Sequence, residues 1–132
     1  PANTRFASNT VPKDSELSTI NLYENKKYFN LKNDNPNRIS VLQVGVSLQY
    51  FNEIKDNKKI DVLGKINNNL PEIKELISTY FLNVTLEQVK DPSEIQKIKD
   101  ELKIKINDLL NHNERSRYEY VYKVIFDDWL FQ

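Results

Sequence analysis

The stretch YEYVYKVIFDDWLFQ, Tyr118–Gln132, decides which fold this chain can adopt. Apolar or aromatic side chains occupy every second position of its first part: Tyr118, Tyr120, Tyr122, Val124 and Phe126. Because successive side chains of a strand point to opposite faces, this spacing predicts a strand with these five residues on one buried face. The alternate positions from Glu119 to Asp127 are half charged and half apolar. We therefore expect the second face to be only partly covered, and the rest of the chain to cover the first.

A second alternating stretch, Arg38–Phe51, predicts a long partner strand. Its apolar positions fall on one face: Leu42, Val44, Val46, Leu48 and Tyr50. An earlier extended segment is expected over Ile20–Leu31. The run of Asn, Asp and Pro in the intervening sequence KNDNPNR, Lys32–Arg38, is typical of turns, so it predicts a solvated hairpin loop between the two strands.

Helical spacing of apolar residues dominates the middle of the chain. It predicts one helix over about Lys58–Asn69, a second from Pro71 to about Asn83, and a long third helix from Asp91 to about Asn111. The apolar stripe of the long helix has spacings of three and four: Ile95, Ile98, Leu102, Ile106 and Leu109. Asp91 is expected to cap it, with Glu94 closing a variant capping box. Thr85 is expected to cap a short turn between the second and third helices.

The order of these elements indicates the fold class. The helices are grouped between strands and do not alternate with them, so we predict an α+β domain with a small, mostly antiparallel or mixed sheet and its helices packed on one face. A length of 132 residues suits one domain. Residues 1–19 read as a linker-like N-terminal segment, and residues 20–132 as the single domain. The chain has no Met, so we expect that a segment upstream of Pro1 has been removed.

Composition excludes several functional classes. The 19 basic and 19 acidic side chains give a net charge of zero, which argues against binding to nucleic acid or an acidic membrane. Without Cys there is no thiolate metal site or Cys nucleophile, and the one His, His112, is expected in an exposed polar turn. The two glycines, Gly45 and Gly64, cannot build a phosphate-binding loop. No catalytic residue, metal site or cofactor is predicted.

Asp127 and Asp128 form the one acidic pair that could carry chemistry. Neighbouring side chains of a strand point to opposite faces, so the two carboxylates cannot work as an acid–base couple without a bulge. A hydrolase that uses both is therefore the weakest hypothesis. A structural or interface role, with one Asp exposed and the other accepting hydrogen bonds near the end of the sheet, fits the pattern better.

The end of the chain resembles the closing motif of the flagellar basal-body-associated FliL family, in which a hydrophobic strand ends in Asp, an aromatic or aliphatic residue, two apolar residues and Gln. Asp128, Trp129 and Gln132 fill these positions. Asp127 and Trp129 depart from the residues that the family usually has there. Shorter matches cover residues 20–132: Asn30-Leu31, Arg38, Pro71-Glu72-Ile73 with Ile77-Ser78, and Thr85–Val89.

This resemblance implies a non-enzymatic protein of the flagellar motor. It implies an N-terminal transmembrane helix upstream of this sequence, a domain of the stomatin/prohibitin (SPFH) type on the periplasmic face of the bacterial inner membrane, and a homo-oligomeric ring. The implied partners are further copies of the chain and the flagellar stator proteins, whose torque-generating state the ring would support to aid motility. No nucleic-acid partner is implied.

Two hypotheses for a functional surface follow. In the first, the strand end links fold and assembly through five residues: Asp127, Asp128, Trp129, Phe131 and Gln132. Segment 1–19 and the partly apolar second face of the sheet would then contact neighbouring protomers. In the second, the chain is a periplasmic or cytosolic ligand-binding module with an apolar cleft beside Tyr118, Tyr120 and Tyr122, although tyrosines at strand spacing more often belong to a core.

Overall fold

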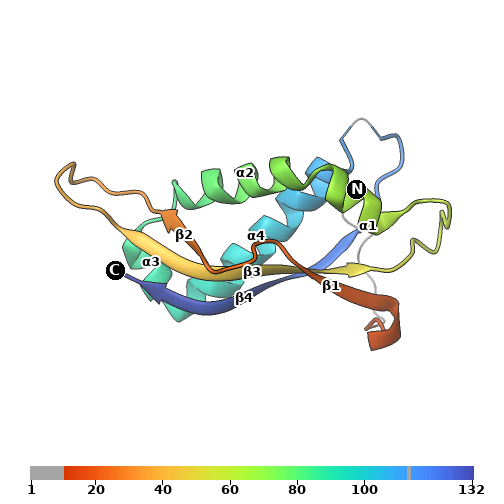
Figure 1. The fold of residues 1–132 in the computed structure, drawn as a ribbon, viewed down its shortest axis with the longest axis horizontal. Helices are drawn as coiled ribbons and strands as arrows, with labels where there is room; N and C mark the ends of the chain where they lie inside the picture. Colours follow the sequence, from red (N-terminus) through yellow and green to blue (C-terminus); the bar gives the residue numbers. More distant parts are fainter. Residues whose placement is uncertain (1–10, 113) are drawn as a thin grey trace.

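A computed structural model of the chain describes residues 11–112 and 114–132, which form four strands and a layer of helices (Figure 1). The strands are β1 (Leu17–Asn21), β2 (Lys27–Asn30), β3 (Val41–Phe51) and β4 (Val121–Phe131). The helices are the 3-10 turn η2 (Asp14–Glu16), α1 (Val62–Asn68), α2 (Leu70–Phe81), α3 (Leu86–Lys90) and α4 (Pro92–Leu110). The α+β class predicted from the sequence is confirmed.

The sheet is built around β3, and every pairing in it is antiparallel. Strand β4 follows one edge of β3, while β1 and β2 pair in succession along the other edge. The expected single segment Ile20–Leu31 is therefore two strands, because the chain leaves the sheet between Asn21 and Lys27. Strand β1 begins at Leu17, within the segment 1–19 that reads as a linker. The first ten residues of that segment lie outside the described part of the chain.

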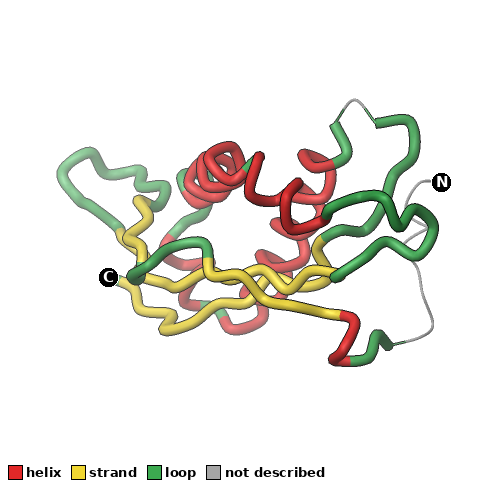
Figure 2. The backbone as a smooth tube through the Cα atoms, turned by 45° about the vertical axis from the view of Figure 1, so that its right-hand side comes forward, coloured by secondary structure: helices red, strands yellow, loops and turns green. Residues whose placement is uncertain are grey.

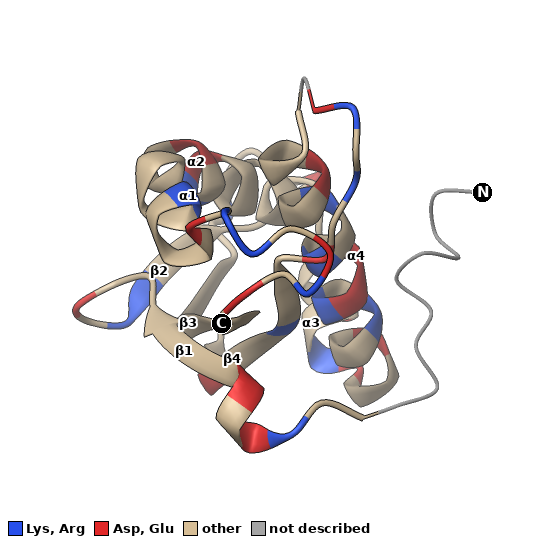
Figure 3. Cartoon of the chain, turned by 90° about the vertical axis from the view of Figure 1, so that its right-hand side faces the viewer, with Lys and Arg blue, Asp and Glu red and all other residues tan. Residues whose placement is uncertain are grey.

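All the α-helices lie on one face of this sheet (Figure 2). The inward face of β3 carries the predicted alternation, and all five of its apolar side chains are buried: Leu42, Val44, Val46, Leu48 and Tyr50. Helix α4 adds Ile98, Leu102 and Ile106 to the same core. Acidic and basic residues are interspersed along the helices and loops (Figure 3). None of the helices described is long and apolar enough to cross a bilayer.

Local capping explains where the helices begin. Helix α1 starts at Val62, later than the expected Lys58, because the Asp61 side chain accepts a hydrogen bond from the Gly64 amide at 3.0 Å. Thr85 caps α3 as predicted, and together with Gln88 it forms a full capping box that was not predicted from the sequence.

Asp91 caps α4 as predicted, since its carboxylate accepts hydrogen bonds from the Ser93 amide and hydroxyl. The predicted closing of this cap by Glu94 is wrong. The Asp91 amide that Glu94 would have bonded already donates to the Gln88 carbonyl at the end of α3. The two helices therefore share Asp91, which is both the C-cap of α3 and the N-cap of α4.

Strand β4 departs from the predicted alternation near its start. Gln49 pairs with Lys123, but the next residue of β3, Tyr50, pairs with Val121, so Tyr122 is an extra residue on β4. This bulge turns Val121 into the core and leaves Tyr122 half-buried, with its ring 5.6 Å from the ring of Phe51. The prediction that Tyr122 shares a buried face with Tyr120 and Val124 is therefore wrong for Tyr122.

Candidate functional site

The predicted assembly residues lie at a second bulge, near the end of β4. Gln43 pairs with Leu130 and Gly45 pairs with Asp127, so Asp128 and Trp129 together oppose the single residue Val44. Asp128 adopts a φ of 55°, the left-handed region, which lets the strand absorb the extra residue. The bulge changes which positions face the helices: Phe126 and Trp129 both pack against the core, although they are three positions apart and a regular strand would place them on opposite faces.

Trp129 is held inside its own domain. Its indole Nε1 donates a hydrogen bond to the Val89 carbonyl of α3 at 2.9 Å. Its ring centroid lies 4.9 Å from that of Phe126 and 6.3 Å from that of Phe81 on α2. These contacts join three elements, so Trp129 anchors the end of the sheet to the helical layer.

The residues beyond Trp129 are exposed. Leu130 is 58% exposed and Phe131 is 41% exposed, and they point to opposite faces of the strand end. Gln132 exchanges two backbone hydrogen bonds with Val41, of 2.8 and 3.0 Å, which fix this end against β3. The side chains of Phe131 and Leu130 are therefore exposed to solvent, while the backbone that carries them is held against β3 by hydrogen bonds.

The two aspartates at the bulge have different partners. Asp127 lies against Gly45, where an added Cβ would sit 3.4 Å from the Asp127 Cβ. Asp128 forms an ion pair with Lys26, in the segment between β1 and β2. The bulge that a paired acid–base couple would have needed is present, but the Asp128 carboxylate is paired with Lys26, and the Asp127 side chain is exposed. In residues 11–112 and 114–132, no group of three or more His, Asp or Glu side chains could hold a metal ion.

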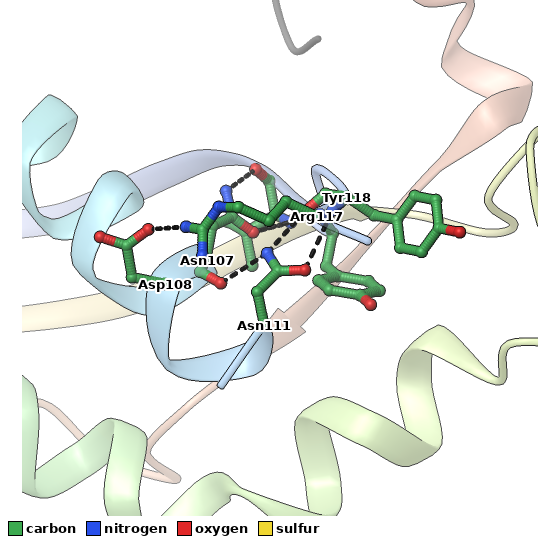
Figure 4. Close-up of polar contacts among 7 residues, drawn as sticks. Asn107, Asp108, Asn111, Arg117 and Tyr118 are labelled. Carbon is green, nitrogen blue, oxygen red and sulfur yellow. Dashed lines mark hydrogen bonds and ion pairs between the residues drawn. The ribbon is translucent and has the colours of Figure 1, made fainter. Parts of the chain in front are cut away.

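A buried polar cluster at the other end of β4 was not found from the sequence. Asn107 of α4 accepts hydrogen bonds from the amides of Tyr120 and Val121, at 3.1 and 2.9 Å, and donates one to the Val121 carbonyl at 2.9 Å (Figure 4). One turn later, Asn111 binds both the amide and the carbonyl of Tyr118 at 2.9 Å. The two side chains bond the incoming chain in the way that a neighbouring strand would.

Arg117 adds an ion pair to Asp108 on the exposed side of this cluster (Figure 4). The sequence did contain one signal for it. Asn107 and Asn111 are four residues apart, so they share a helix face, and Asn107 follows directly on Ile106 of the apolar stripe. Asparagine on the buried side of a helix needs partners, and the nearest unpaired backbone groups are those of a chain entering the sheet.

The tyrosines at the start of β4 do not line one apolar cleft. Tyr118 and Tyr122 border a hollow of about 960 Å³, which also carries the Lys103–Glu119 ion pair of 2.6 Å. Tyr120 does not line it and is 1% exposed. Burial raises the pKa of Tyr120 to about 12, with a further contribution from the negative charge of Glu114. His112 is exposed, as expected.

Comparison with known families identifies the chain. The model of the family described as "Flagellar basal body-associated protein FliL" matches residues 23–132, which include every strand except β1 and all of the helices α1 to α4. No individual curated protein gives a significant match. The matched region contains the bulge at Asp128, the Trp129 anchor and the asparagine cluster. This chain therefore belongs to the FliL family of flagellar basal body-associated proteins.

Proposed function

We propose that this chain is a non-enzymatic accessory of the flagellar motor, whose domain assembles as a homo-oligomeric ring around the stator and supports torque generation. The observation that carries the proposal is the family match over residues 23–132. A one-sided α+β layer is also the class expected of a stomatin/prohibitin-like domain. In this proposal the domain works on the periplasmic face of the inner membrane and is held there by a helix upstream of Pro1.

The end of β4 is the assembly surface in this proposal. Interfaces gain most of their free energy from a few large side chains that are held in place before binding. The Trp129 hydrogen bond to α3 and the Gln132 bonds to Val41 hold the exposed Phe131 in this way. Asp127 and Asp128 contribute indirectly, because the bulge that begins at Asp128, directly after the Gly45–Asp127 pair, sets the direction of Trp129 and Phe131.

Motility under load tests the function. We expect cells that lack the gene to swim more slowly in viscous medium and to hold fewer stator units, measured by tethered-cell torque and by fluorescence of a labelled stator subunit. Normal torque under high load in the deletion strain would overturn the proposed role.

A matched pair of variants tests the surface. Phe131→Ser should reduce chemical crosslinking between full-length protomers in membranes several-fold, because it removes an exposed anchor without touching the core. Ile104→Ser removes an exposed apolar side chain of α4, 58% exposed, and should leave crosslinking unchanged. Equal crosslinking of the two variants would contradict an interface at the end of β4.

The hollow beside Tyr118 and Tyr122 keeps a ligand-binding module as the second candidate. Its lining includes Lys103, Arg117 and Glu119, so a ligand there would need polar as well as apolar groups. A compound that raises the melting temperature of the parent but not of Tyr122→Ala, with the variant still folded by circular dichroism, would favour this candidate. A screen in which every shift survives Tyr122→Ala would remove it.

A further inference from the structure

Helices α2 and α4 form the two walls of a groove on the side of the molecule away from the sheet. The helices run in opposing directions (Figure 1), and the hollow that they line measures about 950 Å³. The side chains of α2 that face the sheet are Ile73, Ile77 and Phe81, all fully buried. The groove is lined by the neighbouring face of α2, so it is separate from the core and from the end of β4.

The floor of the groove is apolar. Leu76 of α2 and Leu109 of α4 are both half-buried and pack against the core, and Ile98 of α4 also lines the groove but is almost fully buried. The exposed parts of the two leucines, one from each helix, offer a partner an apolar contact on the floor of the groove. An apolar floor between two helices suits the apolar face of a third helix, as in packed helical layers.

The walls are acidic. Five carboxylates line the groove against two lysines, Lys97 and Lys105. The acidic residues are Glu72 and Glu75 on α2, and Glu94, Glu101 and Asp108 on α4. Acidic positions on both helices are visible in Figure 3. The three on α4 are seven residues apart, so they lie along one line of the helix at intervals of about 10 Å.

Some of the carboxylates that line the groove already have partners within the domain. The Tyr80 hydroxyl of α2 donates to Glu101 of α4 at 2.8 Å, which ties the two walls together. Burial, and then this bond and the nearby carboxylates, raise the pKa of Tyr80, so the hydroxyl stays protonated as a donor. Asp108 pairs with Arg117. Within the described ranges, Glu72, Glu75 and Glu94 have no ion pair, which leaves negative charge at both ends of a fixed groove.

We propose that the groove between α2 and α4 is a docking site for a cationic amphipathic helix of a partner protein. Its apolar face would lie on Leu76 and Leu109, and its Lys or Arg side chains would meet the unpaired carboxylates at the two ends. Charge complementarity selects this occupant, since an acidic or neutral helix would leave those carboxylates uncompensated. The site is independent of the proposed ring contact at Phe131.

Binding of a synthetic helix tests the proposal. The probe is a peptide of about 18 residues with Leu at every third or fourth position and Lys at every seventh, labelled with a fluorophore. The whole chain should bind it with a Kd that rises with salt, and the amide resonances of Leu76, Ile98 and Leu109 should shift. The same peptide with Glu in place of Lys should bind at least tenfold more weakly.

Two triple variants with the same change of charge complete the test. Glu72→Gln, Glu75→Gln and Glu94→Gln together should weaken binding at least tenfold. Glu24→Gln, Glu53→Gln and Glu87→Gln, all at exposed positions outside the groove, should leave the Kd within about twofold. All six positions are on the surface, and thermal melts check that the variants fold. No binding by the parent, equal loss in both triple variants, or resonance shifts away from the groove would each overturn the proposal.

Discussion

Asp128 is the residue on which the end of the sheet depends. Its φ of 55° lies in a region that costs an ordinary L-residue about 1–2 kcal/mol and that glycine adopts freely. The chain accepts this cost because the bulge turns Trp129 toward Phe81 and the Val89 carbonyl. The ion pair between Asp128 and Lys26 offsets part of it, although both side chains are partly exposed and such pairs contribute at most about 1 kcal/mol.

Two substitutions of Asp128 separate the backbone from the ion pair. Both Asp128→Gly and Asp128→Val remove the carboxylate, but only valine disfavours a positive φ. We expect the glycine variant to match the parent within about 1 kcal/mol and the valine variant to be less stable than it by about 1–2 kcal/mol, measured by urea unfolding. A valine variant as stable as the glycine variant would show that the bulge carries no backbone strain.

At the scale of elements, α4 and β4 are joined by polar as well as apolar contacts. The long helix packs its apolar stripe on the sheet. At its C-terminal end, Asn107 and Asn111 form hydrogen bonds with backbone amides and carbonyls of residues 118–121. Strand β4, which begins at Val121, pairs only with β3, so no described strand lies beside these groups on the side of α4. The helix thus sets the point and the angle at which the last strand enters.

Asn107→Ala should therefore be strongly destabilising. It leaves two amides and one carbonyl without partners in a buried site, and an unpaired buried polar group costs about 1–3 kcal/mol. We expect the free energy of unfolding to fall by about 3–5 kcal/mol in thermal or urea unfolding. The control is Asn68→Ala, at an exposed position in α1, which should change stability by less than about 1 kcal/mol. Similar losses in both variants would refute the role of Asn107.

At the scale of the whole molecule, one face of the sheet is covered by helices and the other is exposed to solvent. The helices cover the inner face, and the outer face combines Tyr28, Gln43 and Leu130 in one row across three strands. Two tyrosine hydroxyls lie on the covered side: those of Tyr23 and Tyr120 are buried without a hydrogen-bond partner among the described residues. Burial raises the pKa of both to about 12, because the charged phenolate loses its hydration.

This burial predicts a loss of stability at alkaline pH. Since the folded-state pKa values lie above the ordinary value near 10, the contribution is complete below about pH 10 and is lost as the pH rises toward 12. In that window, each of these tyrosines lowers the free energy of unfolding by up to about 1.4 kcal/mol per pH unit. Tyr120→Phe should flatten the decline of the free energy of unfolding between pH 9 and 11, whereas Tyr28→Phe, at an exposed position, should not. Identical declines in both variants would contradict this assignment.

Much of the architecture was predictable from neighbouring residues alone. The alternation of Val41–Phe51, the Asn-rich hairpin loop, the caps at Thr85 and Asp91 and the apolar stripe of α4 all depend on contacts within a few positions in the chain. The candidate site was predictable only in part. Its residues were singled out from the sequence, but their division into an anchoring Trp129 and an exposed Phe131 was not.

By itself the sequence determined the α+β class, the order of the elements, the buried face of β3 and the family resemblance, because periodicity, capping and motif spacing are properties of local sequence. Only the tertiary structure decided the bulges at Tyr122 and Asp128, the break between β1 and β2 and the partners of Asn107. These depend on which backbone groups of distant segments meet. A strand of period two cannot bury both Phe126 and Trp129, and pairing with β3 resolves the conflict by inserting one residue, which fixes where the exposed end of β4 points.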